Sequence, residues 1–297
     1  MSILQFIGHT PRSAWSLPRL GTVALLALLA GCEGDVTTDL TTEEPANPNI
    51  TQVVANVRGL QFTGSAGTRT LEFTDAQQLN FLDYKTDNTA LRMFTSEELP
   101  EGSYTGVRLL FDDDQGDDAF VTVSNSTREF TLNVVEGEYA SLDFKFEDNK
   151  RKNESFTLML DLRRSLSFND DNDEYTLKPV LRAVRTGDIG RIEGNLTVNC
   201  PAGDSLGEGA VYLFQGQDVT PDDLDTTGVE PFATTPVFTN SNNTFFYSLR
   251  VLPEGRYTMA VTCNGNDDDP RTDEDLRFRN IVNIELDENE VLKRDLP

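Results

Sequence analysis

Three clusters of carboxylates are the residues of this sequence that most directly suggest chemistry. They are DDDQGDD at Asp112–Asp118, NDDNDE at Asn169–Glu174 and NGNDDDPRTDED at Asn264–Asp275. Calcium binds several carboxylate and carbonyl oxygens on a flexible loop, and all three clusters read as loops. None has the spacing of an EF-hand loop, which has glycine at its sixth position and glutamate at its twelfth. We therefore interpret the clusters as solvated turns of an acidic protein, and predict no metal site and no cofactor.

One of these loops is the calcium candidate if any cluster binds a metal. Asp267, Asp268 and Asp269 follow closely after Cys263. A disulfide at that cysteine would anchor the loop and hold its carboxylates in place. Calcium at these three aspartates is thus the alternative to the solvated turn.

The groups that most enzymes use are missing from the sequence. The only histidine is His9, near the N-terminus, so the rest of the chain has no Ser-His or Cys-His pair and no histidine ligand for a metal. It also has no Ser-x-x-Lys spacing and no phosphate-binding loop. A glycoside hydrolase needs only two carboxylates, which are abundant here, so this activity stays a distant alternative. We predict no enzyme activity and no catalytic residue.

The N-terminus predicts export. Residues 1–20 carry Arg12 and Arg19 and no acid, and an apolar run follows from Gly21 to Ala30. A basic start, a short apolar segment and small residues before a cleavage point are typical of a signal peptide. The run is shorter than the ~20 apolar residues that span a bilayer.

The end of this segment predicts a lipid anchor. The sequence Leu29-Ala30-Gly31-Cys32 resembles the cleavage motif of bacterial lipoproteins. The resemblance implies that residues 1–31 are removed and that Cys32 is acylated, with palmitate among its chains, so that the lipid holds the protein at the membrane. The next residue is Glu33 rather than Asp, which favours the outer membrane over the inner one. The side of that membrane on which the protein lies stays open.

The charge of the chain excludes one class of partner. Fifty Asp and Glu against 25 Lys and Arg give a formal net charge of −25. Such a surface repels the phosphates of nucleic acids, so we predict no nucleic-acid partner. Besides the membrane, the partner classes left open are another envelope protein and a polysaccharide.

The rest of the chain predicts an all-β protein with two domains. Residues 32–50 are polar, contain two prolines and read as a flexible linker. Two series of short segments follow, rich in β-branched and aromatic residues and broken by Gly, Asp and Asn, which is typical of β-sandwiches. The composition changes near Thr186, so we predict consecutive β-sandwiches, Ig-like or prealbumin-like, at 51–186 and 187–297.

The two series share the motif LPEG-x-YT, at Leu99–Thr105 and Leu252–Thr258. Proline presets φ for a turn and glycine accepts φ > 0. The tyrosine after the glycine can pack its ring inward while its hydroxyl reaches the backbone. We interpret the motif as an entry turn for a strand, needed once in each sandwich, rather than as a duplicated binding site.

The first series resembles the bacterial lipoprotein domain DUF4382, a family of unknown function. The resemblance rests on LNFLDYKTDNTALRMFTSEELPEGSYTGVRLLF (Leu79–Phe111) and LMLDLRRSLSFNDDNDEYTLKPVLRAV (Leu158–Val184). Within the second stretch, the residues that match the closing motif of the family are Asp161, Ser165, Leu166, Tyr175, Leu177, Lys178 and Pro179. The resemblance implies a β-sandwich in a lipoprotein and implies no activity.

The second series resembles a prealbumin-like or carboxypeptidase-regulatory-like β-sandwich. The resemblance rests on the strand and turn order of GRIEGNLTV, GAVYLF and NTFFYSLRVLPEGRYTMAV, with Phe245–Tyr257 as its centre. Cys200 and Cys263 both follow strand patterns in this series. Two cysteines in an exported domain favour one disulfide, and we predict that these two residues form it.

These observations favour a non-catalytic, lipid-anchored protein of the bacterial cell envelope that presents β-sandwich interaction modules. The runner-up is a carbohydrate-binding or adhesion accessory lipoprotein. The glycoside hydrolase is the third and most distant hypothesis.

Overall fold

Short β-strands make up most of the chain, which confirms the all-β fold class. The computed structural model describes residues 34–65, 67–86, 89–112, 118–124, 126–147, 152–225 and 227–297. The predicted signal peptide, the lipid-anchor candidate Cys32 and most of the first acidic cluster lie outside the described residues. Among the described residues, no helix is long and apolar enough to cross a bilayer.

The described residues of the first part of the chain form twelve strands and two short helical turns. They are β1 (Gly34–Glu43), β2 (Ile50–Gly64), β3 (Gly67–Asn80), η1 (Phe81–Tyr84), β4 (Leu91–Leu99), β5 (Gly102–Phe111), β6 (Phe120–Val123), β7 (Glu129–Val134), β8 (Ala140–Phe146), β9 (Asn153–Asp161), α1 (Leu162–Ser165), β10 (Leu166–Asn169), β11 (Glu174–Leu177) and β12 (Leu181–Arg185).

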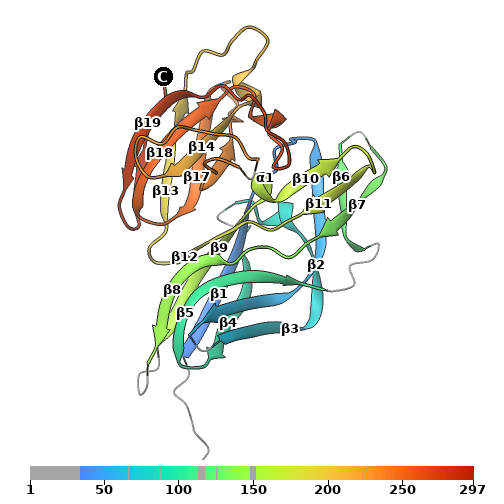
Figure 1. Ribbon diagram of the computed structural model, residues 1–297, viewed down its shortest axis with the longest axis vertical. Helices are drawn as coiled ribbons and strands as arrows, with labels where there is room; N and C mark the ends of the chain where they lie inside the picture. The colour runs from blue at the N-terminus through green and yellow to red at the C-terminus, as the bar shows by residue number, and fades with distance from the viewer. Residues whose placement is uncertain are drawn as a thin grey trace, which may run out of the picture. The chain divides into compact units, whose positions relative to one another are not determined.

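These strands form a β-sandwich (Figure 1). One sheet has the order β12-β9-β1-β4, and the other has the order β10-β11-β7-β6-β2-β5-β8 with β3 paired to β2. Val36 and Leu158 of the first sheet share one core with Leu60 and Phe62 of the second. In β8 the residues alternate strictly between buried and exposed, as the apolar and polar alternation of ASLDFKF predicts.

The linker predicted for residues 32–50 is wrong over Gly34–Glu43, because this segment is a central strand of the sandwich. β1 pairs with β4 in antiparallel register and with β9 in parallel register. Its side chains are mostly buried, including those of Thr38, Thr41 and Thr42. Threonine is β-branched and suits a strand, and these threonines make a buried strand look polar in sequence.

In the second part of the chain, the residues that the structure describes form eight strands and two short helical turns. They are β13 (Gly190–Leu196), η4 (Leu206–Glu208), β14 (Ala210–Gln215), β15 (Ala233–Pro236), β16 (Phe238–Thr239), β17 (Phe245–Leu252), β18 (Gly255–Thr262), η5 (Gly265–Asp267), β19 (Arg279–Leu286) and β20 (Val291–Lys293).

These strands form a second, smaller β-sandwich. Its sheets have the orders β16-β17-β13-β20 and β15-β14-β18-β19. Ile192 and Leu249 of one sheet share a core with Leu213 and Met259 of the other. The opposite face of β14 is also buried, because Leu224 of a long loop packs with its side chains. This second contact explains why AVYLFQ reads as a continuous apolar run instead of an alternating one.

The repeated motif is a corner in both sandwiches. Each copy leads from a strand of one sheet into a strand of the other, from β4 to β5 and from β17 to β18. The Tyr104 hydroxyl donates a hydrogen bond to the Pro100 carbonyl at 2.7 Å, and the Tyr257 hydroxyl donates to the Pro253 carbonyl at 2.8 Å. Both rings are buried, so the predicted role of the tyrosine is confirmed.

The glycine of the motif has a different role in each copy. Gly102 has a φ of 144°, a conformation that side chains disfavour. At Gly255 the need is space, because a Cβ atom there would lie 3.1 Å from the ring of Tyr257. The predicted left-handed conformation therefore holds for the first copy alone.

The division of the chain near Thr186 agrees with the sheets. Among the described residues, strands up to β12 pair only with one another, and so do strands from β13 onward. Gly31–Pro297 nevertheless forms one compact unit. The predicted start of the first sandwich at residue 51 is too late, because β1 at Gly34–Glu43 belongs to it.

Candidate functional site

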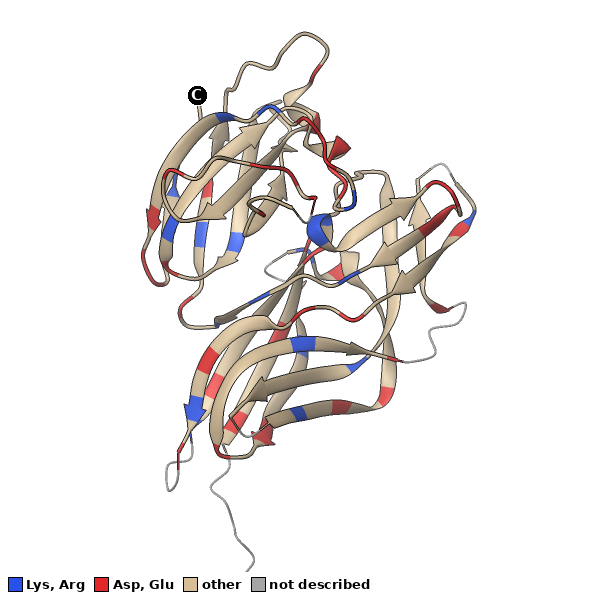
Figure 2. Ribbon diagram, in the orientation of Figure 1, with Lys and Arg blue, Asp and Glu red and all other residues tan. Residues whose placement is uncertain are grey.

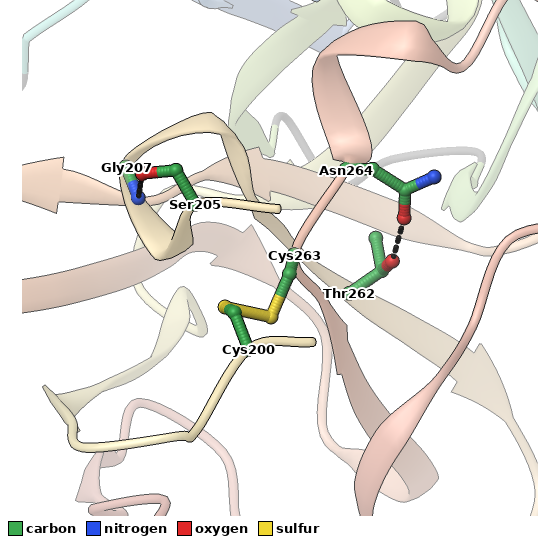
Figure 3. The surroundings of a disulfide bond; sticks show 6 residues. All are labelled: Cys200, Ser205, Gly207, Thr262, Cys263 and Asn264. Atoms are coloured by element: carbon green, nitrogen blue, oxygen red, sulfur yellow. Dashed lines mark hydrogen bonds between the residues drawn. A yellow bond between two sulfur atoms is a disulfide. The ribbon is translucent and has the colours of Figure 1, made fainter. Parts of the chain in front are cut away.

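The predicted disulfide joins Cys200 to Cys263 (Figure 3). Cys200 lies in the loop after β13, and Cys263 directly follows β18, which belongs to the opposite sheet. The bond closes a span of 63 residues and ties the two sheets of the second sandwich together. It also fixes the start of the loop that was predicted as the calcium candidate. Next to it, the Thr262 hydroxyl donates to the Asn264 side-chain oxygen at 2.7 Å.

The structure separates the three aspartates of that loop. Asp268 is buried, and its two oxygens accept hydrogen bonds from the Tyr212 hydroxyl and from the Leu224 backbone N–H. Asp269 forms an ion pair with Arg271 at 3.2 Å. Among the described residues, only Asp268 of the three belongs to a group of carboxylates close enough to share a cation.

Its neighbours in that group are Asp223 and Glu274, and one oxygen of each carboxylate lies within 4.8 Å of the others. Burial raises the pKa of all three carboxyl groups. Backbone N–H groups and the Tyr212 hydroxyl already satisfy Asp223 and Asp268. This cluster could hold a metal ion, and calcium stays the untested alternative to the predicted solvated turn.

A different set of charged side chains lies buried where the two sandwiches meet. Arg182 of β12 forms an ion pair with Asp161 at 3.2 Å, and both side chains are almost fully buried. The same guanidinium donates to the carbonyls of Arg250 at 3.1 Å and Val251 at 3.4 Å, both on β17. Asp161 in turn accepts from the Thr234 hydroxyl of β15 at 3.3 Å. The first sandwich is thus hydrogen-bonded to both sheets of the second.

The backbone of the second sandwich is strained at this junction. Val251 has a φ of 52°, which is rare for a β-branched residue. Its carbonyl accepts from Arg182, and its side chain packs against Met159 and Val184 of the first sandwich. The junction therefore combines apolar contact with charged hydrogen bonds.

A buried glutamate adds a second ion contact to the junction. Glu43, the last residue of β1, accepts a hydrogen bond from the Thr235 hydroxyl at 3.3 Å and lies 4.0 Å from Arg250. Arg250 also donates to the Thr42 carbonyl at 2.9 Å. Burial raises the pKa of Glu43 to about 7, although Arg250 opposes this shift.

The short helix α1 presents one arginine to the second sandwich. Arg163 is fully buried and donates to the Gly265 carbonyl and, at 3.5 Å, to the Tyr212 hydroxyl. Its Nε and Nη1 have no hydrogen-bond partner among the described residues. The positive charge of Arg163 favours the ionised form of nearby Asp268. Because the Arg163 guanidinium already places a positive charge beside Asp268, binding of a divalent cation there is less favourable.

Beside the junction lies a cleft of about 750 Å³. Residues of both sandwiches line it, among them Val135 and Leu181 of the first and Leu224 and Phe232 of the second. Arg164 of α1 also lies in its wall. A cleft of this size between two packed modules is a usual place for a small-molecule site.

Sequence reasoning found only part of this site. Asp161 and Ser165 stand out in the sequence through their match to the closing motif of the resembled family. Glu43 could not be found, because it lies in the segment read as a linker. Arg250 is a single charged residue in an apolar strand, FFYSLRVL, and this is the one signal for its burial in an ion contact.

The comparisons with known proteins identify the first sandwich. Residues 33–179 match the family model described as a domain of unknown function, DUF4382, and this part of the chain belongs to that family. The resemblance to DUF4382 is thus confirmed, with a start at residue 33 that includes β1. A search of curated proteins found no match. The prealbumin-like resemblance of 187–297 stays a prediction.

Several solved structures of bacterial proteins are similar to this chain. The TIE protein of Bacillus anthracis has 11% identity and a TM-score of 0.21, and the match covers 88% of this chain and 34% of that protein. A cell adhesion protein of Bacteroides fragilis, described as putative, has 11% identity and a TM-score of 0.24, with 88% and 92% covered. The fimbrial anchor protein Mfa2 of Porphyromonas gingivalis has 12% identity and a TM-score of 0.18, with 79% and 80% covered. This chain spans about a third of the Bacillus anthracis protein, and TM-scores this low carry no conclusion about its function.

Proposed function

We propose that this DUF4382 protein is a non-catalytic, lipid-anchored protein of the bacterial cell envelope that presents its two β-sandwiches as one interaction body. The observation that carries the proposal is the buried junction around Asp161 and Arg182. A buried ion pair that is hydrogen-bonded on both sides holds two modules in one arrangement. A flexible string of independent domains does not need such a junction.

The disulfide and the N-terminus support the cellular location. Disulfides persist in exported proteins, where the surroundings are oxidising. Cys32 carries the lipid in this proposal, and only Glu33 separates it from Gly34, the first residue of β1. Two residues span at most about 7 Å, so the first sandwich lies close to the bilayer without a spacer. The outer membrane is proposed because the residue after Cys32 is not Asp.

The experiment that tests the anchor is metabolic labelling of the producing bacterium with a palmitate analogue. The wild-type protein should carry the label, and Cys32→Ser should lose it and leave the membrane fraction. Cys200→Ser with Cys263→Ser is the matched control, and it should keep the label. A labelled Cys32→Ser protein would show that the lipid is attached to another residue, and would contradict the proposed anchor.

The side of the membrane is tested by protease treatment of intact cells, with a periplasmic lipoprotein as the control. Loss of this protein while the control survives assigns the interaction body to the outside. Protection of both proteins assigns it to the periplasm, and cross-linking should then identify an envelope protein partner.

Carbohydrate binding is the second candidate function, and one groove favours it. A groove of about 720 Å³ in the first sandwich is lined by Gln61, Arg108, Asn133 and Glu136, whose polar groups suit sugar hydroxyls. Affinity electrophoresis against a panel of polysaccharides tests this candidate. Retention that Asn133→Ala reduces supports it, and unchanged mobility on every polysaccharide counts against it.

A further inference from the structure

We propose that the cleft beside the junction binds a small carboxylate with an apolar body, and that the Arg164 guanidinium holds the carboxylate. The cleft has a volume of about 750 Å³, which suits a small molecule. This assignment adds a ligand class to the interaction body proposed above, but it requires neither the lipid anchor nor the outer membrane.

The charge of the cleft is the first observation. In the whole chain, Asp and Glu outnumber Lys and Arg by two to one. In the lining of this cleft the ratio is reversed: four cationic residues, Arg164, Lys178, Arg182 and Arg271, face two acidic ones, Glu138 and Glu230. Figure 2 shows α1 in blue, with red segments scattered over loops and strands of a mostly tan ribbon. The lining of the cleft therefore holds more cationic side chains, relative to acidic ones, than the composition of the chain predicts.

Two of these cations are already neutralised. Arg182 is paired with Asp161, and Arg271 is paired with Asp269. Neither Arg164 nor Lys178 lies within ion-pair distance of a carboxylate among the described residues. The two remaining positive charges are those that a ligand can use.

Arg164 is the better placed of the two. The Asp161 side chain caps α1 by accepting from the Arg164 backbone N–H at 3.3 Å, which fixes the start of the side chain. The guanidinium donates to the Phe232 carbonyl at 3.0 Å, a bond that uses one of its five N–H groups, and the nearby carboxylates of Asp161 and Glu230 favour its charged form. Burial lowers the pKa of Arg164, because few water molecules solvate its charge. A carboxylate gains a two-pronged, charge-assisted hydrogen bond in such surroundings.

The rest of the lining selects the body of the ligand. Val135, Leu181, Leu224 and Phe232 present apolar side chains to the cleft, and 42% of the Val135 surface is exposed. A largely apolar lining with a few polar groups is typical of ligand sites. The hydroxyl groups of a sugar acid would find few partners on these side chains. A carboxylic acid with an aliphatic or aromatic body fits better.

The test is isothermal titration calorimetry on the mature chain, with Cys32→Ser to remove the acyl groups. The probes are 4-phenylbutyrate, 4-phenylbutanol and glucuronate. We expect 4-phenylbutyrate to bind at least tenfold more tightly than the other two, because only this probe has both a carboxylate and an apolar body. If 4-phenylbutanol binds as tightly as 4-phenylbutyrate, the carboxylate charge does not contribute to binding and the role of Arg164 is overturned. Preference for glucuronate, or no binding of 4-phenylbutyrate at millimolar concentration, overturns the proposal.

Variants locate the site. Arg164→Gln should weaken binding of 4-phenylbutyrate at least tenfold, and Arg164→Lys should restore part of it. The matched control is Arg256→Gln on β18, an exposed arginine that is not part of the cleft lining, which should leave the affinity unchanged. An equal loss in Arg256→Gln shows a general charge effect and overturns the site.

A second variant covers the case in which Arg164→Gln does not fold. Val135→Glu adds a carboxylate to the cleft from a half-exposed position, where the fold tolerates a polar group. It should abolish binding of 4-phenylbutyrate without lowering the unfolding midpoint. Undiminished binding in this variant places the ligand elsewhere and overturns the proposal. None of these binding experiments depends on lipid at Cys32. A negative result here would therefore contradict the ligand site without contradicting the lipid anchor.

Discussion

At the scale of single residues, the hydroxyl of one tyrosine stabilises the corner of each sandwich. Tyr104 and Tyr257 both donate to the carbonyl of a proline four positions earlier, at 2.7 and 2.8 Å. The two corners are separate in sequence and belong to different cores. The motif therefore recurs because each sandwich needs the same kind of corner between its two sheets.

We expect Tyr104→Phe and Tyr257→Phe each to lower the free energy of unfolding by about 1 kcal/mol, since each removes one buried hydrogen bond. The effects should add in the double variant, because the sites share no partner. Urea denaturation measures both changes. Tyr84→Phe is the control, and it should change the free energy of unfolding by less than about 0.5 kcal/mol. A loss in the control as large as in the corners would contradict the role of the hydroxyl.

Glu43 makes a prediction about pH. Its pKa is about 7 in the folded protein and 4.5 as the ordinary value, so the folded state holds the proton more tightly than the unfolded state. The stabilisation is therefore fully present below pH 4.5 and is lost as the pH rises through about 7. The difference between the two pKa values corresponds to roughly 3 kcal/mol in the free energy of unfolding.

Glu43→Gln should remove this pH dependence, because glutamine resembles the protonated side chain at every pH. We expect the variant to be more stable than the wild type at pH 8 and similar to it at pH 5. Thermal denaturation across this range measures the effect. Glu44→Gln, next to Lys85 at the surface, is the control and should leave the slope unchanged. The same slope in wild type and Glu43→Gln would contradict the assignment.

At the scale of elements, β1 decides whether the first sandwich forms. It lies between β4 and β9, so its removal leaves β4 without a partner in this sheet and β9 paired on one side only, to β12. Val36 and Leu40 are fully buried in the core of this sandwich. A linker in this place would have been dispensable, but a central strand is not.

A chain that begins at Thr51 should therefore fail to fold, whereas one that begins at Gly34 should fold. Circular dichroism and the dispersion of amide NMR signals distinguish the two outcomes. Leu40→Ala is the milder variant, and we expect it to lower the free energy of unfolding by about 2–5 kcal/mol. A folded chain from Thr51 would restore the linker interpretation.

The disulfide between the sheets of the second sandwich gives a further prediction at this scale. Cys200→Ser with Cys263→Ser should lower the free energy of unfolding by roughly 4 kcal/mol, as loop-closure entropy predicts for a span of 63 residues. Urea denaturation in the presence and absence of a reducing agent measures it. Cys32→Ser is the control and should behave as the wild type does.

The sequence predicts most of this architecture, and the parts it misses share a physical reason. Local signals sufficed for the alternation of β8, for the tyrosine corners and for the pairing of two strand-end cysteines. They failed for β1, because its threonines look polar and its neighbour β9 lies far along the chain. Asp268 was singled out, but its partner Asp223 comes from a different loop, and a carboxylate in an acidic protein gives no signal of its own.

At the scale of the whole molecule, the buried charges join the sandwiches. Arg182 contacts Asp161 on its own sandwich and two carbonyls on the other, so removal of its partner leaves a buried charge unpaired. Breaking such a pair costs far more than the net contribution of the pair itself. The junction thus couples two modules that share no sheet.

Asp161→Asn should lower the free energy of unfolding by about 3–5 kcal/mol. In calorimetry the wild type should unfold in one transition, and the variant should show two, because the sandwiches lose their coupling. Glu285→Gln, in an exposed ion pair with Arg256, is the control and should leave the single transition in place. Two transitions in the wild type would contradict the coupling.

The position of β1 has a consequence for the order in which the molecule assembles. An exported chain emerges from its N-terminus, so β1 appears before every strand that completes it. The hydrogen bond from Thr235 to Glu43 spans 192 positions, and the one from Arg250 to Thr42 spans 208. Contacts of such high contact order form slowly, and here they cannot begin until most of the chain has crossed. The end of β1 that carries Thr42 and Glu43 is therefore enclosed only after the second sandwich has been synthesised, whereas its pairing with β4 and β9 can form earlier.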